Sequence, residues 1–275
     1  MPQVMVITGA TGAIASATAK ALARQGHDLA LLGRSQDKLS ALRQQILQEA
    51  PATRVQLYPV DFSDLPRVRR AALELREAHE HIHALLHVAA VFKQTRTVTS
   101  AGLETMFTVN HLAPLLLTRE LTETLQRTAK SRILTVTAPS TTRIDFQDVM
   151  GLERFQALRA FGASKMANLL FAFKLARSGL VSHAFYPGLV RSELMNEASP
   201  LVRVISGWVS RPPARAGHAL GELATSDRFL QPNGQFFNLT RPIRASPYAY
   251  DVGPQDRLWE ASLELLDGVE TAGQP

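Results

Sequence analysis

Short apolar runs recur along this chain, and longer stretches whose apolar positions have helical spacing separate them. A continuous apolar run bounded by glycine or polar residues is typical of a strand that is buried on both faces of a sheet. We predict such strands at about residues 3–8, 28–33, 54–60, 83–89, 132–137, 180–186 and 234–239. Because strands alternate with helices, the pattern predicts an α/β fold in which helices cover both faces of a parallel sheet.

One segment, residues 193–215, does not fit this alternation. It contains Pro200, Gly207, Pro212 and Pro213 among apolar residues. This mixture predicts an amphipathic lid over a binding site. A pair of surface helices packed on the body is the alternative interpretation.

The first predicted strand ends in a glycine-containing turn. The turn reads Thr8-Gly9-Ala10-Thr11-Gly12 and leads directly into an alanine-rich helical segment. In parallel sheets, ligands bind beyond the carboxyl ends of the strands. A turn of this kind lets the backbone bend at Gly9, approach a ligand closely at Gly12 and direct free helix N–H groups at a pyrophosphate. The alternative is a strand-to-helix turn that uses glycine without binding a ligand.

The composition narrows the classes of protein that fit. A length of 275 residues with 45% apolar residues suits one α/β domain spanning residues 1–275. The 30 basic and 24 acidic residues give a net charge of +6, but they are spread along the chain, which excludes a basic nucleic-acid-binding arm. The absence of cysteine excludes disulfides, cysteine-ligated zinc and thiol catalysis. With no signal peptide before the first strand and no apolar stretch of membrane-spanning length, we expect a cytoplasmic protein without nucleic-acid or membrane partners.

Two charged residues follow the second and third predicted strands. Arg34 follows Gly33, where a guanidinium favours the 2′-phosphate of NADP and a carboxylate would instead bind the ribose 2′-hydroxyl of NAD. Asp61 follows the third strand, where a carboxylate can accept a hydrogen bond from the adenine amino group. We therefore expect NADP(H) as the cofactor. A capping role or a plain surface charge is the alternative for each residue.

These motifs, together with several further along the chain, resemble the short-chain dehydrogenase/reductase family in order and spacing. The further motifs are Val109-Asn110-His111-Leu112, Ser164-Lys165-Met166-Ala167-Asn168, Tyr186-Pro187-Gly188, Gly234-Gln235-Phe236-Phe237 and Leu258-Trp259-Glu260-Ala261-Ser262. Within the family, the sequence is most similar to the branch of retinol dehydrogenases and WW-domain oxidoreductases. The resemblance implies a Rossmann-type, doubly wound parallel sheet of seven strands in a single domain.

The resemblance also implies hydride transfer between a nicotinamide and a carbonyl or alcohol carbon. In the family, a tyrosine exchanges the proton, and a lysine four residues later lowers the pKa of that tyrosine and holds the nicotinamide ribose. A serine orients the substrate oxygen and an asparagine supports a water relay. Asn110 and Lys165 match two of these four positions, whereas Phe161 stands at the tyrosine position and Ala138 at the serine position. Loss of general acid–base assistance typically costs about a hundred- to ten-thousand-fold in rate.

Other hydroxyl groups lie near the missing pair. Thr137, Ser140, Thr141 and Thr142 surround the loop after the fifth predicted strand, and a shift of the alignment by one or two residues makes Ser140 the orienting serine. Tyr186 ends the sixth strand and is the tyrosine best placed for proton transfer. The alternatives are turn hydrogen bonds for the first group and a core aromatic for Tyr186.

The cofactor positions also depart from the family pattern. Ala13 stands where the second glycine of the commoner pattern falls. The family's Asn-Asn-Ala-Gly stretch reads His87-Val88-Ala89-Ala90, which removes an asparagine contact and adds a methyl group near the adenosine. The cofactor contacts that we expect are Thr8, Gly9, Thr11, Gly12, Ala13, Ile14, Arg34, Asp61, Phe62, Ala89, Ala90, Lys165, Pro187, Gly188, Val190 and Ser192. For Ser192, a helix N-cap is the alternative role.

Four histidines, His79, His81, His83 and His87, lie close together in the sequence. A metal site needs its ligands on one rigid element, whereas this run passes from the end of a helix into a strand. We therefore interpret the first three as solvated turn residues and His87 as half-buried, and we expect no metal site.

The resulting hypothesis is an NADP(H)-dependent oxidoreductase that acts on a small hydrophobic carbonyl or alcohol through an atypical active site. The proton then comes from water, from the substrate or from Tyr186. Two alternatives stay open: a protein that binds NADP as a sensor or structural ligand without hydride transfer, and a non-redox isomerase, lyase or cyclase in the same pocket. The resemblance implies a homodimer or homotetramer.

Overall fold

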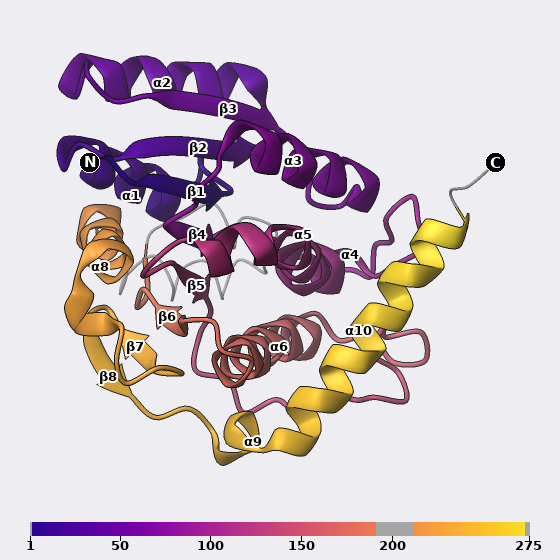
Figure 1. Cartoon of the computed structure of the whole chain (residues 1–275). Coiled ribbons are helices and arrows are strands. Elements are labelled where there is room, and N and C mark those ends of the chain that lie inside the picture. The colour runs from indigo at the N-terminus through magenta and orange to yellow at the C-terminus, as the bar shows by residue number, and fades with distance from the viewer. Residues whose placement is uncertain (1, 191–211, 273–275) are drawn as a thin grey trace.

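One sheet of eight strands organises the residues that the computed structural model describes, 2–190 and 212–272 (Figure 1). The strands are β1 (Val4–Thr8), β2 (Asp28–Gly33), β3 (Val55–Pro59), β4 (Ala84–His87), β5 (Arg132–Val136), β6 (Ser182–Tyr186), β7 (Phe236–Asn238) and β8 (Arg241–Ile243). Their order across the sheet is β3-β2-β1-β4-β5-β6-β7-β8. The direction of winding reverses between β1 and β4, and such a switch point is where ligands bind in sheets of this kind.

The seven predicted strands are confirmed as β1 to β7, which pair in parallel in a doubly wound, Rossmann-type arrangement. β8 is an additional edge strand that pairs antiparallel with β7, so the sheet is one strand wider than expected. The sequence pattern did not reveal β8 because it has three residues, one of them Pro242. Proline is tolerated there because an edge strand leaves one side of its backbone unpaired.

Helices cover both faces of this sheet. On one face lie α1 (Ala13–Arg24), α2 (Gln36–Glu49) and α8 (Pro213–Thr225). On the other face lie α3 (Leu65–Ala78), α5 (Ala113–Arg127), α6 (Ala157–Arg177) and α10 (Val252–Ala272), with α10 packed on α6 (Figure 1). The shorter elements are α4 (Thr105–Phe107), the π-helix η1 (Thr108–Leu112), the 3₁₀-helix η3 (Asp227–Phe229) and α9 (Pro247–Tyr250). None of the helices in the described parts of the chain is long and apolar enough to cross a membrane.

Most of the predicted lid, residues 193–215, lies outside the described residues, as does Ser192. The last three residues of that segment, 213–215, form the first turn of α8 instead. A proline in the first turn is common at the start of a helix, and the lid over a binding site stays a prediction.

A glycine sets the distance between α8 and α1. A Cβ atom at Gly217 would lie 2.6 Å from Cβ of Ala17 and 2.7 Å from the backbone nitrogen of Thr18. We expect Gly217→Ala to lower the free energy of unfolding by about 1–3 kcal/mol, because a methyl group forced into a packed contact displaces its neighbours. Urea denaturation measures the change.

Gly221→Ala on the same helix is the matched control. The atoms nearest to a Cβ at Gly221 are 3.7 Å away on Leu22, which is an ordinary contact. Alanine there is expected to be neutral or to stabilise by up to about 1 kcal/mol through its helix propensity. Equal destabilisation by the two substitutions would contradict the packing argument.

Candidate active site

The turn between β1 and α1 is held against the end of β4. Gly9 has a φ of +63°, and a Cβ atom there would lie 2.8 Å from the Cα of Ala89. The Thr8 hydroxyl donates to the carbonyl of Leu86 (3.3 Å) and accepts from the backbone N–H groups of Val88 (2.9 Å) and Ala89 (3.1 Å). Position 9 therefore needs glycine for both its conformation and its close contact with the backbone.

The first turn of α1 has no capping side chain and no acidic residue of its own to complement its free N–H groups. Gly12 is the N-cap and provides no side-chain hydrogen bond. By contrast, α2 and α3 are capped by the side chains of Ser35 and Asp64. The open N-terminus of α1 beside the Gly9 turn fits a phosphate group, because helix N–H groups and the helix dipole both favour an anion.

The two charged residues beyond β2 and β3, Arg34 and Asp61, differ in their hydrogen-bond partners. Arg34 is exposed, and its guanidinium has no hydrogen bond or ion pair with the described residues. Asp61 Oδ1 accepts from the backbone N–H (2.9 Å) and the hydroxyl (2.8 Å) of Ser63, which is a local turn. Phe62 buries its side chain in the core, so only its backbone can contact a ligand. The Arg34 guanidinium is thus available to bind an anion, whereas one carboxylate oxygen of Asp61 already accepts hydrogen bonds from Ser63.

Asn110 joins three elements near the switch point. It lies in the π-helix η1, a backbone form often found at functional sites. Its Oδ1 accepts from the N–H of Val91 (2.7 Å), and its Nδ2 donates to the carbonyl of Val91 and to the hydroxyl of Ser164, both at 3.0 Å. The amide therefore fixes the loop after β4 to α6.

Phe161 and Lys165 lie one turn apart on α6. The Phe161 ring is half-buried and meets the ring of Phe92 edge to face at 5.5 Å between centroids. Nζ of Lys165 lies 5.2 Å from the centroid of the Phe161 ring. Lys165 is 6% exposed, and this burial lowers its pKa to about 8 because an apolar environment disfavours the ammonium form.

The hydroxyl groups around this pair donate to backbone carbonyls. Thr137 donates to Lys165 (2.7 Å), Ser140 to Gly162 (2.8 Å) and Ser164 to Phe161 (2.8 Å). Ser140 also accepts from the N–H of Thr142, as in a turn, and Ala138 is half-buried just after β5. This geometry favours the turn interpretation of Ser140 over a substrate-orienting role.

Sequence reasoning missed Gly162, the neighbour of Phe161. A Cβ atom at this position would lie 2.5 Å from the hydroxyl oxygen of Thr142, so glycine admits that side chain to the helix surface. The sequence shows a glycine between Phe161 and Lys165, which could have drawn attention to this position. The contact with Thr142 exists only in the folded structure.

The end of β6 supplies the remaining predicted residues. Tyr186 is half-buried, packs against the core, and its carbonyl accepts from the N–H of Leu239 (3.0 Å). Gly188 has a φ of +78°, and no atom of the described residues lies within 4 Å of the place of a Cβ. Val190 is half-buried.

Of the three histidines that we expected to be solvated, His81 is exposed but His79 and His83 are half-buried, and the His81 and His83 rings meet edge to face at 6.5 Å between centroids. His83 Nδ1 accepts from the N–H of Val4, and His79 Nε2 lies 3.4 Å from the hydroxyl of Tyr58. His87 is buried, not half-buried as we expected, because α5 covers it and its Nε2 lies 2.8 Å from the hydroxyl of Thr118. Burial lowers the pKa of His87 to about 3, so its ring is neutral.

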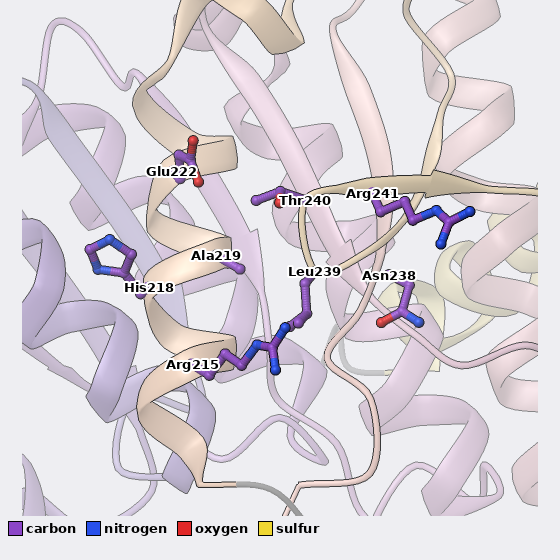
Figure 2. Close-up of a pocket in the computed structure, with 8 residues that line it drawn as sticks. All are labelled: Arg215, His218, Ala219, Glu222, Asn238, Leu239, Thr240 and Arg241. Atoms are coloured by element: carbon purple, nitrogen blue, oxygen red, sulfur yellow. The ribbon is translucent and has the colours of Figure 1, made fainter.

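A pocket of about 570 Å³ lies between α8 and the β7–β8 hairpin (Figure 2). Its lining residues are Arg215, His218, Ala219, Glu222, Asn238, Leu239, Thr240 and Arg241. None of the predicted catalytic or cofactor residues lines it. Asn238 is the register partner of Tyr186, so the pocket is next to the end of β6 and separate from Phe161 and Lys165.

The model of the short chain dehydrogenase family matches residues 3–201. This chain belongs to the short-chain dehydrogenase family. Human retinol dehydrogenase 12 is 32% identical over 274 residues, which cover 96% of this chain and 86% of that protein. An uncharacterized protein from Mycobacterium paratuberculosis has a similar structure, with a TM-score of 0.73, 25% identity and coverage of 97% of this chain and 96% of that one. An alcohol dehydrogenase from the archaeon Thermococcus sibiricus, solved with 5-hydroxy-NADP, has a similar fold, with a TM-score of 0.67, 20% identity and coverage of 86% and 96%.

Membership in the family supports an oxidoreductase that binds NAD(P)(H). The turn at Gly9, the open N-terminus of α1 and the buried Lys165 are the residues of this chain that fit such a cofactor. The roles of individual residues stay predictions.

Proposed function

We propose that this protein is an NADP(H)-dependent oxidoreductase that acts on a hydrophobic carbonyl or alcohol without a tyrosine proton donor. The observation that carries the proposal is the uncapped N-terminus of α1, held beside the Gly9 turn with the free Arg34 guanidinium beyond the next strand. The retinol dehydrogenase relatives are named for a hydrophobic alcohol, which supports the substrate class. When bound, the reduced dinucleotide supplies the hydride.

Residues of this chain would bind the different parts of the cofactor. The N–H groups of α1 and the Gly9–Gly12 turn would hold the pyrophosphate, and Arg34 would hold the 2′-phosphate. Lys165 would hold the nicotinamide ribose, and Phe161 and Phe92 would provide an apolar surface beside it. Asn110 keeps the loop after β4 in place.

A thermal-shift comparison and a turnover assay test the proposal together. We expect NADPH to raise the melting temperature more than NADH does, and excess protein to oxidise NADPH when decanal is added as a hydrophobic carbonyl probe. Failure of both nucleotides to bind would contradict the proposal, as would binding of NADPH without oxidation across a panel of aldehydes and ketones. The second result would favour a protein that binds the nucleotide without redox chemistry. This is the second candidate function, because Phe161 and Ala138 lack the hydroxyl groups that the family uses at these positions.

Arg34→Ala is expected to raise the Kd for NADPH by about 10–100-fold and to leave the Kd for NADH unchanged. A hydrogen bond to a charged group contributes about 1.5–3 kcal/mol, and each 1.4 kcal/mol is about tenfold in affinity. Fluorescence titration measures both constants. Arg43→Ala is the control, because Arg43 is an exposed arginine of α2 and its loss removes the same charge elsewhere. Equal weakening of NADPH and NADH by Arg34→Ala would contradict the role of Arg34.

A further inference from the structure

Lys165 is a buried amine without a counter-ion in the described parts of the chain. It is 6% exposed, and its Nζ has no hydrogen bond or ion pair with those residues. The comparably buried Arg132, in contrast, donates to the carbonyls of Leu223 (3.1 Å) and Ser226 (2.7 Å). A buried cation normally has such partners, because an unpaired buried charge is costly. The Lys165 amine is therefore free to bond a ligand.

Nζ of Lys165 lies over the face of the Phe161 ring, at 5.2 Å from its centroid. A cation over an aromatic face gains about 0.5–2 kcal/mol, which partly offsets the burial of the ammonium form. The amine is thus oriented at the helix position that carries a tyrosine hydroxyl elsewhere in the family. A phenylalanine there keeps the ring face and removes the competing phenol.

Several ionisable groups on the elements packed against α6 have partners away from Lys165. His111 of η1 pairs with Ser262 of α10, and His183 of β6 with the carbonyl of Phe229. Asp256 of α10 pairs with Lys174 and Arg177, further along α6. Tyr186 ends β6, Tyr250 of α9 accepts from the N–H of Ala245, and β5 contributes Arg132 at its opposite end. Burial alone lowers the pKa of Lys165, to about 8, without a contribution from any of these groups.

We propose that the ammonium group of Lys165 is the proton donor for carbonyl reduction in this protein. The inference rests on the proposed function. A new C–H bond forms at the carbonyl carbon from the hydride of the reduced nicotinamide, and the carbonyl π electron pair moves to oxygen. That oxygen takes a proton from Nζ, which leaves the alcohol, the oxidised dinucleotide and a neutral amine. The amine then regains a proton from solvent, and alcohol oxidation runs the same steps in reverse.

The expected pH dependence follows from the protonation state that the step needs. Reduction requires the ammonium form, so kcat/KM for reduction, which reports the free enzyme, is full below the pKa of Lys165 and falls as pH rises through about 8. Oxidation requires the neutral amine and rises over the same range. A general acid whose pKa is near the working pH is well matched to its task.

Lys165→Arg tests the donor role, because arginine keeps the positive charge but holds its proton throughout the accessible pH range. We expect the Kd for NADPH to change by less than about tenfold, the kcat with decanal to fall by about a hundredfold or more, and the loss of reductase activity near pH 8 to disappear. Lys174→Arg, the same exchange further along α6 at a lysine paired with Asp256, is the control and is expected to keep wild-type kinetics. A Lys165→Arg variant with the wild-type kcat and pH profile would overturn the proposal.

A second readout needs no cofactor. The ¹³Cε signal of Lys165, assigned by its loss in Lys165→Arg, is expected to titrate near pH 8 in the nucleotide-free protein, well below the ordinary value of 10.5. Titration at the ordinary value would contradict the proposal. Failure of the proposed function is distinct, because wild-type protein would then not oxidise NADPH with any carbonyl, whereas failure of the Lys165 role leaves that turnover intact in Lys165→Arg.

Discussion

Phe161→Tyr together with Ala138→Ser, introduced into the Lys165→Arg variant, is expected to raise NADPH-dependent reduction of decanal by about a hundred- to ten-thousand-fold. The new phenol would project from the ring position that already lies one helix turn from residue 165. The arginine would lower the pKa of that phenol, because a nearby cation favours the phenolate form. The kcat/KM of the purified variants measures the gain.

The same pair of substitutions in the wild-type background is expected to give a smaller gain. Lys165 would already supply the proton there, and two donors to one oxygen do not add. Phe155→Tyr is the control, because Phe155 belongs to the same aromatic cluster as Phe161 but lies before α6. Equal gains in the two backgrounds would argue against Lys165 as donor. If neither background gained activity, the site would differ from that of an ordinary reductase by more than the two missing hydroxyl groups.

Gly9→Ala is expected to abolish dinucleotide binding and to lower the free energy of unfolding by about 2–5 kcal/mol. A left-handed backbone costs a residue with a side chain about 1–2 kcal/mol, and a forced contact adds about 1–3 kcal/mol. Both costs apply at position 9, where φ is +63° and a Cβ atom would lie 2.8 Å from the Cα of Ala89. Displacement of that contact would move the turn away from the N-terminus of α1. Urea denaturation and NADPH fluorescence measure the two effects.

Gly26→Ala separates the two costs. Gly26 has a φ of +81°, but no atom lies within 4 Å of the place of its Cβ. It is therefore expected to lose only about 1–2 kcal/mol and to bind NADPH as the wild type does. If Gly9→Ala were no more destabilising than Gly26→Ala, or if it still bound NADPH, the contact with Ala89 would have no role in shaping the nucleotide turn.

Local patterns in the sequence were enough to predict the seven parallel strands and to place Phe161 and Lys165 on one face of a helix. A strand buried on both faces must be apolar along its whole length, and residues four apart on a helix must share a face. The absence of a phenol at Phe161 beside Lys165 is therefore readable from the sequence alone, as is the glycine turn after the first strand. β8 was not readable, because three residues paired to a neighbouring strand leave no periodic signal.

Contacts between distant segments decided the rest. Whether Ser140 could orient a substrate depended on the carbonyl of Gly162, 22 residues away, which accepts a hydrogen bond from the Ser140 hydroxyl. His87 is buried because α5 packs over it, and Gly217 matters because α1 lies against it. Lys165 has a lowered pKa only because the assembled core removes water from its amine. Composition and spacing thus determine which groups are present, while desolvation and hydrogen-bond partners, which exist only after the chain has folded, determine which of those groups are free to react.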